Sequence, residues 1–376
     1  MSVNTSEIKE SIRLAEEHRA VLHGVPEKAY EEHKTTAYVR KVCESYPVNI
    51  IDIGMETGLV CYLDAGKTDT VALRADIDAV PTENGPKHLC GHDAHAASLL
   101  GAMHYLCITK DELAHNVLFI FQPAEEDTTG AKSMLDNGLL DKVPQRPSRL
   151  FGIHNRPEAD CGEIIVHQGG LMAEKSSFTI KYTGVAGHSS APQKCIDPII
   201  PAAALVSGIQ TIVSKNVDPF EPVMCTVNSI RAGAPDVAVP EHAVITGYIR
   251  SFDHEVHKRM EERLDTLARG IADAYECKPD IEIVNLVPAV NNSAEMHAIA
   301  MEAARKVVDE ENIIDTKPCM ASEDFAVLAE RIPAFFYWVG SGTPGQNNAA
   351  WHDKAFNVDA HYTETAVPLL CAAAMK

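Results

Sequence analysis

The segment HLCGHDAH, residues 88–95, concentrates side chains that can bind a metal ion or a proton. Cys90 and His92 are two residues apart, so in an extended loop both side chains can point to the same side. A thiolate and an imidazole together suit zinc or another late transition metal. Taken alone, the segment is equally compatible with a polar turn in which Asp93 caps the helix that follows.

Further candidate ligands follow apolar runs that are typical of buried strands. Glu125 and Glu126 come directly after NVLFIFQPA, His154 lies within RLFGIHNRP, and His352 lies in WHDKAF. Taken singly, a solvated turn explains the two glutamates, and a hydrogen bond within the fold explains either histidine. Taken together, these residues complete a set of nitrogen, oxygen and sulfur ligands.

The adjacent carboxylates of Glu125 and Glu126 suggest a division of labour. At the end of a strand they are expected to face different ways, so that one binds a metal and the other addresses a water. Metal-assisted hydrolysis needs both functions, because the metal lowers the pKa of its water towards ~7 and the free carboxylate carries the proton.

Alternating helices and strands must position these groups. Helical periodicity covers residues 7–22 and 35–45, and short apolar runs at 58–65 and 70–77 are typical of strands. Open α/β sheets gather functional side chains at the carboxyl ends of their strands. The first 170 or so residues therefore predict an α/β domain.

The pattern changes at about residue 175 to four alternating strands and two long helices, at 197–215 and 254–275. Such a set is typical of a compact α+β sandwich inserted into the first domain. After about residue 287 the chain returns to the pattern of helices and strands seen in the first domain. We therefore predict a discontinuous catalytic domain, residues 1–174 and 287–376, and an inserted domain, residues 175–286.

The composition and charge of the chain indicate how many domains to expect and which partners to exclude. A chain of 376 residues with 45% hydrophobic side chains is longer than a single hydrophobic core usually accommodates, so two domains are expected. A formal net charge of −20, without a cluster of Lys and Arg, argues against nucleic acid and membrane partners. The first residues are acidic and helical rather than signal-like, and the ten cysteines form no CxxC pair, so a cytoplasmic protein with reduced thiols is expected.

Seven motifs then occur in a fixed order along the chain: LRADIDAVP, CGHDAHAASLLGA, FQPAEE, GIHNRP, GHSSAPQKCIDPI, SEDFAVL and WHDKAF. Together they resemble the metallo-aminoacylase and exopeptidase family, in particular its branch of hippurate hydrolases, N-acyl-amino-acid deacylases and plant auxin-conjugate hydrolases. The resemblance covers nearly the whole chain. It implies an α/β catalytic domain with a mixed sheet flanked by helices. It also implies that the inserted α+β domain, a four-stranded sheet with two helices, serves as a lid and as the surface of a homodimer.

The resemblance also implies two divalent metal ions per subunit, zinc or manganese, with nickel and cobalt as further candidates. The implied metal ligands are Cys90, His92, Glu126, His154 and His352. Glu126 would be the shared ligand. The sequence leaves the roles of Asp93 and His95 open, with helix capping and support of the ligands as the preferred interpretations.

The implied catalytic roles fall on four further residues. Glu125 would be the general base that activates the water and then protonates the leaving amine. Asp78 would orient a ligand histidine. His188 would reach the site of the other subunit and stabilise the tetrahedral oxyanion, and Arg250 would bind the carboxylate of the substrate.

Three features depart from the family pattern. Val237 stands where the family usually has an asparagine, and Gln193 stands where it usually has a second histidine. The loop before His88 is unusually short. All three bear on the substrate pocket, so no relative's substrate is carried over.

The leading hypothesis is a metal-dependent amidohydrolase that cleaves the amide bond of N-acyl amino acids. A dipeptidase or carboxypeptidase with the same dinuclear site is the alternative, because these substrates differ only beyond the scissile bond. A non-catalytic small-molecule-binding protein is disfavoured because all five ligands and Glu125 are present. A cysteine hydrolase with Cys90 as nucleophile would need a partnering base rather than further metal ligands.

Overall fold

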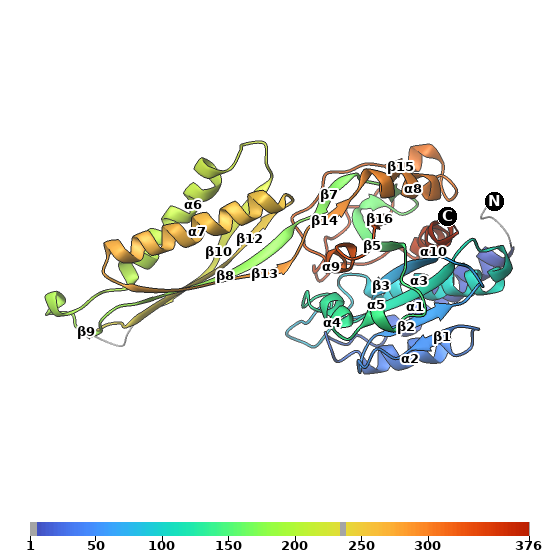
Figure 1. Ribbon diagram of the computed structural model, residues 1–376, viewed down its shortest axis with the longest axis horizontal. Helices are drawn as coiled ribbons and strands as arrows, with labels where there is room; N and C mark the ends of the chain where they lie inside the picture. The colour runs from blue at the N-terminus through green and yellow to red at the C-terminus, as the bar shows by residue number, and fades with distance from the viewer. Residues whose placement is uncertain (1–5, 234–237, 376) are drawn as a thin grey trace. The chain divides into compact units, whose positions relative to one another are not determined.

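The computed structural model of the chain describes residues 6–233 and 238–375 and divides into two compact units (Figure 1). The first unit comprises Met1–Gly169, Asn291–Pro318 and Asp324–Lys376, and the second comprises Gly170–Val290 and Cys319–Glu323. The predicted insertion, residues 175–286, lies within the second unit.

An eight-stranded mixed sheet forms the centre of the first unit, with the strand order β1-β2-β4-β3-β5-β16-β6-β15. Its strands are β1 (Asn49–Ile51), β2 (Leu59–Leu63), β3 (Thr70–Asp76), β4 (Asn116–Gln122), β5 (Arg149–Asp160), β6 (Ile164–Ile165), β15 (Ile313–Ile314) and β16 (Ala334–Gly342). Strands β4, β3, β5 and β16 run parallel to one another, whereas β2 is antiparallel to both of its neighbours, β1 and β4. Strands β3 and β4 are buried along their whole length, which agrees with their mainly apolar sequences. The predicted α/β class is confirmed.

The helices of the first unit surround this sheet. They are α1 (Ser6–His23), α2 (His33–Cys43), α3 (His92–Ile108), α4 (Gly130–Asp136), α5 (Leu139–Lys142), α8 (Ala294–Ala304), α9 (Phe325–Ala329) and α10 (Tyr362–Ala374). Nearly every residue of α3 is buried, as expected for a helix without a polar face. A Cβ added at Gly101 would lie 2.8 Å from the Cβ of Ala15 on α1, so glycine permits the close contact of the two helices. Helix α3 begins at His92, a predicted ligand.

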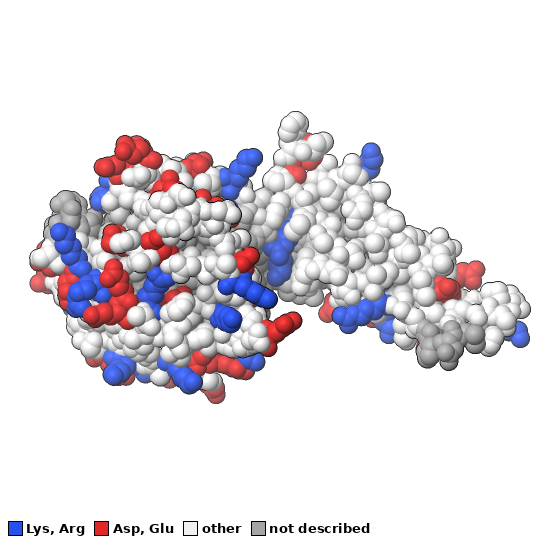
Figure 2. Space-filling view, turned by 180° about the vertical axis from the view of Figure 1, so that it is seen from behind, with Lys and Arg blue, Asp and Glu red and all other residues white. Residues whose placement is uncertain are grey.

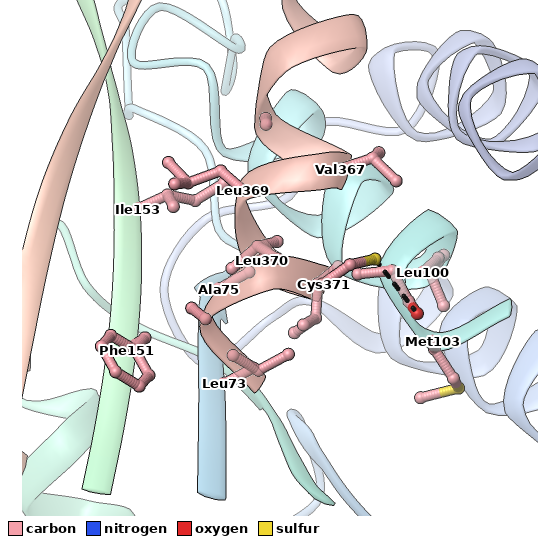
Figure 3. Close-up of a cluster of buried hydrophobic side chains, with 14 of the residues drawn as sticks. Leu73, Ala75, Leu100, Met103, Phe151, Ile153, Val367, Leu369, Leu370 and Cys371 are labelled. Carbon is pink, nitrogen blue, oxygen red and sulfur yellow. Dashed lines mark hydrogen bonds between the residues drawn. The ribbon is translucent and has the colours of Figure 1, made fainter. Parts of the chain in front are cut away.

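Figure 3 shows the core where β3, β5, α3 and α10 meet. Leu73 and Ala75 of β3, and Phe151 of β5, lie on the sheet side, and Leu370 projects from α10. All of them are at most 1% exposed and belong to one continuous hydrophobic cluster. This cluster fixes α10 and the sheet together.

Truncation of Leu370 to alanine is expected to lower the free energy of unfolding by about 2–5 kcal/mol, because the transfer of its side chain is lost and a cavity remains. Urea unfolding followed by circular dichroism measures the loss. Val21 of α1, which is 44% exposed, supplies the matched control, and Val21→Ala is expected to stay within about 0.5 kcal/mol of the unmodified protein. Equal losses in the two variants would contradict the assignment of Leu370 to the core.

A four-stranded antiparallel sheet with the order β10-β12-β8-β13 forms the second unit, and helices α6 and α7 cover one of its faces (Figure 1). These elements are β8 (Glu174–Thr183), α6 (Ile199–Asn216), β10 (Val223–Ala232), β12 (His242–Ser251), α7 (His254–Ala274) and β13 (Lys278–Val287). Alternate residues of β8, such as Phe178 and Ile180, are buried against the helices. The four strands and two helices agree with the predicted fold, and the role as lid or dimerisation surface stays a prediction.

The remaining elements are short. They are β7 (Gly169–Met172), β9 (Gly187–His188), β11 (Ala238–Val239), β14 (Val290–Asn292) and the 3-10 turns Lys110–Glu112, Pro192–Lys194 and Glu310–Asn312. Within the described residues, none of the helices is both long and apolar enough to cross a membrane. On the face drawn in Figure 2, acidic and basic side chains are interspersed, and the Lys and Arg side chains do not merge into one surface.

Candidate metal centre

The candidate residues of the first unit lie at the carboxyl ends of its parallel strands and on adjoining segments. Asp78 follows β3 by two residues, Glu125 follows β4 by three, and His154 lies on β5 beside Trp338 of β16. Neighbouring parallel strands end at the same edge of a sheet, which brings these side chains together. His92 reaches the same place from the first residue of α3.

Within the described residues, four groups of side chains lie close enough to hold a metal ion, and two of them overlap at Glu126. The ligand atoms of Cys90, Glu126 and His352 lie within 4.8 Å of one another, and so do those of His92, Glu125 and Glu126. Glu126 belongs to both groups, as a shared ligand would. Its Oε2 lies 3.4 Å from Nε2 of His352, whose backbone has a φ of +66°.

The rings of His92 and His154 are each held by one nitrogen. Nδ1–H of His92 donates to Oδ1 of Asp78 at 3.1 Å, and Nδ1–H of His154 donates to the carbonyl oxygen of Asn155 at 2.8 Å. In its neutral form each ring therefore has its lone pair on Nε2. Nε2 of His154 lies 3.5 Å from Sγ of Cys90, which adds His154 to the cluster. Fixing one nitrogen so that the other can bind is typical of metal-ligating histidines.

Glu125 and Glu126 stand on a turn, because β4 ends at Gln122. In this turn Ala124 has a φ of +55°, in the left-handed region that residues other than glycine rarely adopt. The buried carboxylate of Glu32 accepts the N–H of Ala124 at 2.8 Å and so holds this conformation.

The turn brings both carboxylates to the same place. Oε2 of Glu125 lies 4.0 Å and Oε1 of Glu126 lies 3.8 Å from Nε2 of His92. The expectation that the two side chains face different ways is wrong, because it assumed the alternation of a strand. Asp78 also supports the turn, since its Oδ2 accepts the N–H of Glu126 at 2.9 Å.

The electrostatics of the cluster favour a bound cation. Burial alone would lower the pKa of His92. The carboxylates of Asp76 and Asp78 outweigh burial, so the pKa of His92 is raised above its ordinary value, to about 10. Burial opposes the charge of Glu126, yet His352 and His92 hold the pKa of Glu126 below its ordinary value. The acids around His92 thus draw positive charge into a buried site.

The residues fit divalent metal ions. Nε2 of His92 and Oε1 of Glu126 are buried and make no hydrogen bond within the described part of the chain. Buried polar atoms of this kind need a partner, and a metal ion supplies one. The thiol, imidazole and carboxylate donors are those that zinc prefers, while the imidazoles and carboxylates also suit manganese.

The surroundings of Cys90 do not favour a nucleophile. Burial, Glu126 and Glu125 raise the pKa of its thiol well above the ordinary value. Reactive cysteines need the opposite environment, with a positive charge beside the sulfur. The hypothesis of a cysteine hydrolase therefore loses support.

Asp93 does not cap helix α3, so that prediction is wrong. The N-cap residue is Gly91, and no side chain caps this end of the helix. Oδ2 of Asp93 instead accepts a hydrogen bond from Nδ1–H of His23 at 2.9 Å and lies 3.7 Å from Nε of Arg19. The carboxylate of Asp93 therefore binds His23 and Arg19 instead of the backbone N–H groups at the start of the helix.

His95 supports the cluster, and both of its nitrogens are engaged. Nδ1–H donates to Oδ1 of Asp76 at 2.7 Å, and Nε2 accepts the backbone N–H of Asn155 at 2.9 Å. The ring therefore has no lone pair left for a metal ion.

Two predicted site residues belong to the second unit. His188 is exposed on β9, and Arg250 is partly buried near the end of β12, where it donates to Oγ of Ser322 at 2.9 Å. Gln193 lies in the 3-10 turn Pro192–Lys194. Val237 lies outside the described residues.

Sequence reasoning missed three buried supports of the cluster: Glu32, Asp76 and Asn155. Asp76 had a signal, because it precedes Asp78 by two residues and so shares its side of an extended chain. Asn155 adjoins a predicted ligand. Glu32 stands in an ordinary polar segment and had no signal.

Comparisons with known proteins agree with this geometry. Residues 72–374 match the model of peptidase family M20/M25/M40. N-acetylcysteine deacetylase of Bacillus subtilis (strain 168) is 34% identical over 355 residues, which cover 91% of this chain and 90% of that protein. N-acetyldiaminopimelate deacetylase of Lactococcus lactis subsp. cremoris (strain SK11) is 32% identical over 371 residues, with 93% and 94% covered. The solved structure of the Bacillus subtilis YXEP protein, a dinuclear metal binding peptidase from the M20 family, superposes with a TM-score of 0.83 at 30% identity and covers 98% of each chain.

Proposed function

Since this chain belongs to peptidase family M20/M25/M40 and is a hydrolase that acts on amide bonds, we propose that it removes the acyl group from N-acyl amino acids with the help of two divalent metal ions. The observation that carries the proposal is the convergence of thiol, imidazole and carboxylate groups around Glu126 in the first unit. The two deacetylases that resemble the chain over nine-tenths of its length support the substrate class.

Five side chains would hold the metal ions: Cys90, His92, Glu126, His154 and His352. When bound, the ions lower the pKa of a water and polarise the scissile carbonyl. Glu125 takes the proton of the attacking water and delivers it to the leaving amine. Asp78 keeps His92 in the required tautomer and anchors the N–H of Glu126.

The inserted domain completes the proposed mechanism. His188 of the other subunit donates a hydrogen bond to the developing oxyanion, and the guanidinium of Arg250 binds the α-carboxylate of the substrate. The protein would then be a homodimer that associates through this domain. A cytoplasmic location is proposed with it, since all ten cysteines are free thiols.

Substrate kinetics test the substrate class. With zinc or manganese supplied, N-acetyl and N-benzoyl amino acids are expected to be hydrolysed with a higher kcat/KM than dipeptides that carry a free amine. The reverse order would replace the deacylase with a dipeptidase or carboxypeptidase that uses the same site. The absence of turnover on every substrate, together with binding of one of them, would favour a binding protein.

Removal of the metal is expected to abolish hydrolysis, because the chain's own groups cannot polarise the carbonyl and activate the water without the ions. Dialysis against a chelator, followed by metal analysis and an activity assay, measures the effect. Addition of zinc or manganese is expected to restore activity. A cysteine hydrolase would instead keep its activity in the chelator.

A further inference from the structure

Asn155 lies on β5 directly after His154 and is 0% exposed. Its side-chain Nδ2 donates a hydrogen bond to the carbonyl oxygen of Cys90 and lies 3.1 Å from Nε2 of His95. Its backbone N–H donates to the same nitrogen of His95 at 2.9 Å. These contacts attach strand β5 to the loop of Cys90 and to helix α3.

The other end of the same amide engages two further segments. Oδ1 of Asn155 accepts a hydrogen bond from Oγ–H of Ser341 on β16 at 3.0 Å and from Nε1–H of Trp351 at 3.2 Å. Trp351 immediately precedes His352. The Asn155 amide therefore contacts every segment that carries a predicted histidine or cysteine ligand.

On the basis of the metal centre in the proposed function, we propose that Asn155 is a positioning residue. It holds the segments that carry the ligands in their binding arrangement before any metal ion arrives. Its side chain contacts no substrate or metal in this role. Its effect is to raise metal affinity, because ligands that are already arranged need not be ordered when the ion binds.

Only an amide suits this position. The carboxamide of asparagine offers two donors and two acceptors. One donor and both acceptors have their own partners here, and the second donor shares Nε2 of His95 with the backbone N–H. An aspartate of the same shape has no donor and would set a carboxylate oxygen against the carbonyl of Cys90. The packing is also tight, since a Cβ added at Gly91 would lie 2.5 Å from Nδ2 of Asn155.

The chain contains a matched control in Asn116, which is 2% exposed. Asn116 is the first residue of β4, at the end of the strand away from the candidate metal site. Its Oδ1 accepts the N–H groups of Ala65 and Lys67 at 2.9 and 3.1 Å, and its Nδ2 donates to Lys67 O and Gln145 Oε1 at 2.8 and 3.1 Å. Asn155→Asp and Asn116→Asp thus remove equivalent buried amides, and only the first amide contacts ligand segments.

Zinc affinity of the full chain, measured by competition with a chromogenic chelator, tests the proposal. Asn155→Asp is expected to weaken zinc binding by about 10- to 100-fold, as is usual when the hydrogen-bond partners of metal ligands are changed. Asn116→Asp is expected to leave zinc binding unchanged, although both variants lower the urea midpoint. Zinc binding by Asn155→Asp as tight as in the unmodified chain, or equal weakening in both variants, would overturn the proposal.

A milder variant guards against misfolding. Trp351→Phe keeps an aromatic ring at this position but removes the pyrrole part of the indole with its Nε1–H, the donor to Asn155. Zinc binding is expected to weaken less than in Asn155→Asp, and unchanged affinity would overturn the proposal. If the unmodified chain itself bound no zinc or manganese, the proposed function would fail. Zinc binding by the unmodified chain with no effect of these substitutions would leave the proposed function intact and remove only the role of Asn155.

Discussion

Glu125→Gln is expected to keep its metal ions and to lose about 10²- to 10⁴-fold in kcat/KM on N-acyl amino acids, the usual contribution of a general base. Glutamine has the shape of glutamate but cannot accept the proton of the water. The geometry gives the reason for choosing Glu125, which is 7% exposed and has Oε2 4.0 Å from Nε2 of His92. Steady-state kinetics together with metal analysis of the same preparation measure both quantities.

Asp127→Asn supplies the control for this prediction. Asp127 lies on the same turn, directly after Glu126, but its side chain is exposed. The substitution removes the same charge two residues away and is expected to leave kcat/KM unchanged. Full activity of Glu125→Gln would exclude Glu125 as the base, and loss of metal from this variant would make Glu125 a ligand instead.

The elements of the fold were largely predictable because they depend on short periodic patterns. The helix expected at 254–275 is α7 (His254–Ala274), and the apolar run after His115 is β4 (Asn116–Gln122). Their ends carry local signals, such as Asp253, whose carboxylate accepts the N–H of Val256 at 2.9 Å. Such signals lie within a few residues of the feature that they determine.

The residue types of the candidate site and the supporting role of Asp78 were predictable, but the other long-range contacts that hold the site were not. Asp93 was assigned to the helix end because the sequence does not show that His23, 70 positions earlier, takes its carboxylate. The turn of Glu125 and Glu126 depends on Glu32, which is 92 positions from Ala124. These contacts join segments that only the folded chain brings together, so no local pattern indicates them.

The hydrogen bonds that support the site continue into the sheet as far as Arg74 of β3, which is 0% exposed. Its guanidinium donates to Oε1 of Gln122 and Oδ2 of Asp76, both at 2.9 Å, and to Oδ1 of Asp324 at 3.2 Å. Asp76 in turn accepts the hydrogen bond of His95 at 2.7 Å. This chain of charged groups connects the centre of the sheet to His95, which supports the predicted metal ligands.

Arg74→Met is therefore expected to lower the free energy of unfolding by about 3–5 kcal/mol, the usual cost of removing one partner from a buried ion pair. Methionine fills part of the space but leaves the carboxylates of Asp76 and Asp324 without the guanidinium. Urea unfolding of the metal-free protein at neutral pH measures the loss, because bound metal would add its own stabilisation.

The loss should depend on pH in a defined direction. Burial raises the pKa of Asp76, but His92, His95 and Arg74 outweigh it and hold the pKa well below the ordinary value. A carboxyl group with a lowered pKa stabilises the fold above about pH 4, and that contribution is lost as the pH falls below this value. The difference between Arg74→Met and the unmodified chain is therefore expected to shrink in acid.

Arg13→Met separates this effect from the removal of any arginine. Arg13 pairs with Glu10 and Glu17 on the surface of α1, and its side chain is 50% exposed. Water screens such pairs, so the urea midpoint of this variant is expected to stay unchanged at every pH. If the midpoint of Arg74→Met also stayed unchanged, the buried guanidinium would contribute no more than a surface one, and the charged chain beneath the site would have no structural role.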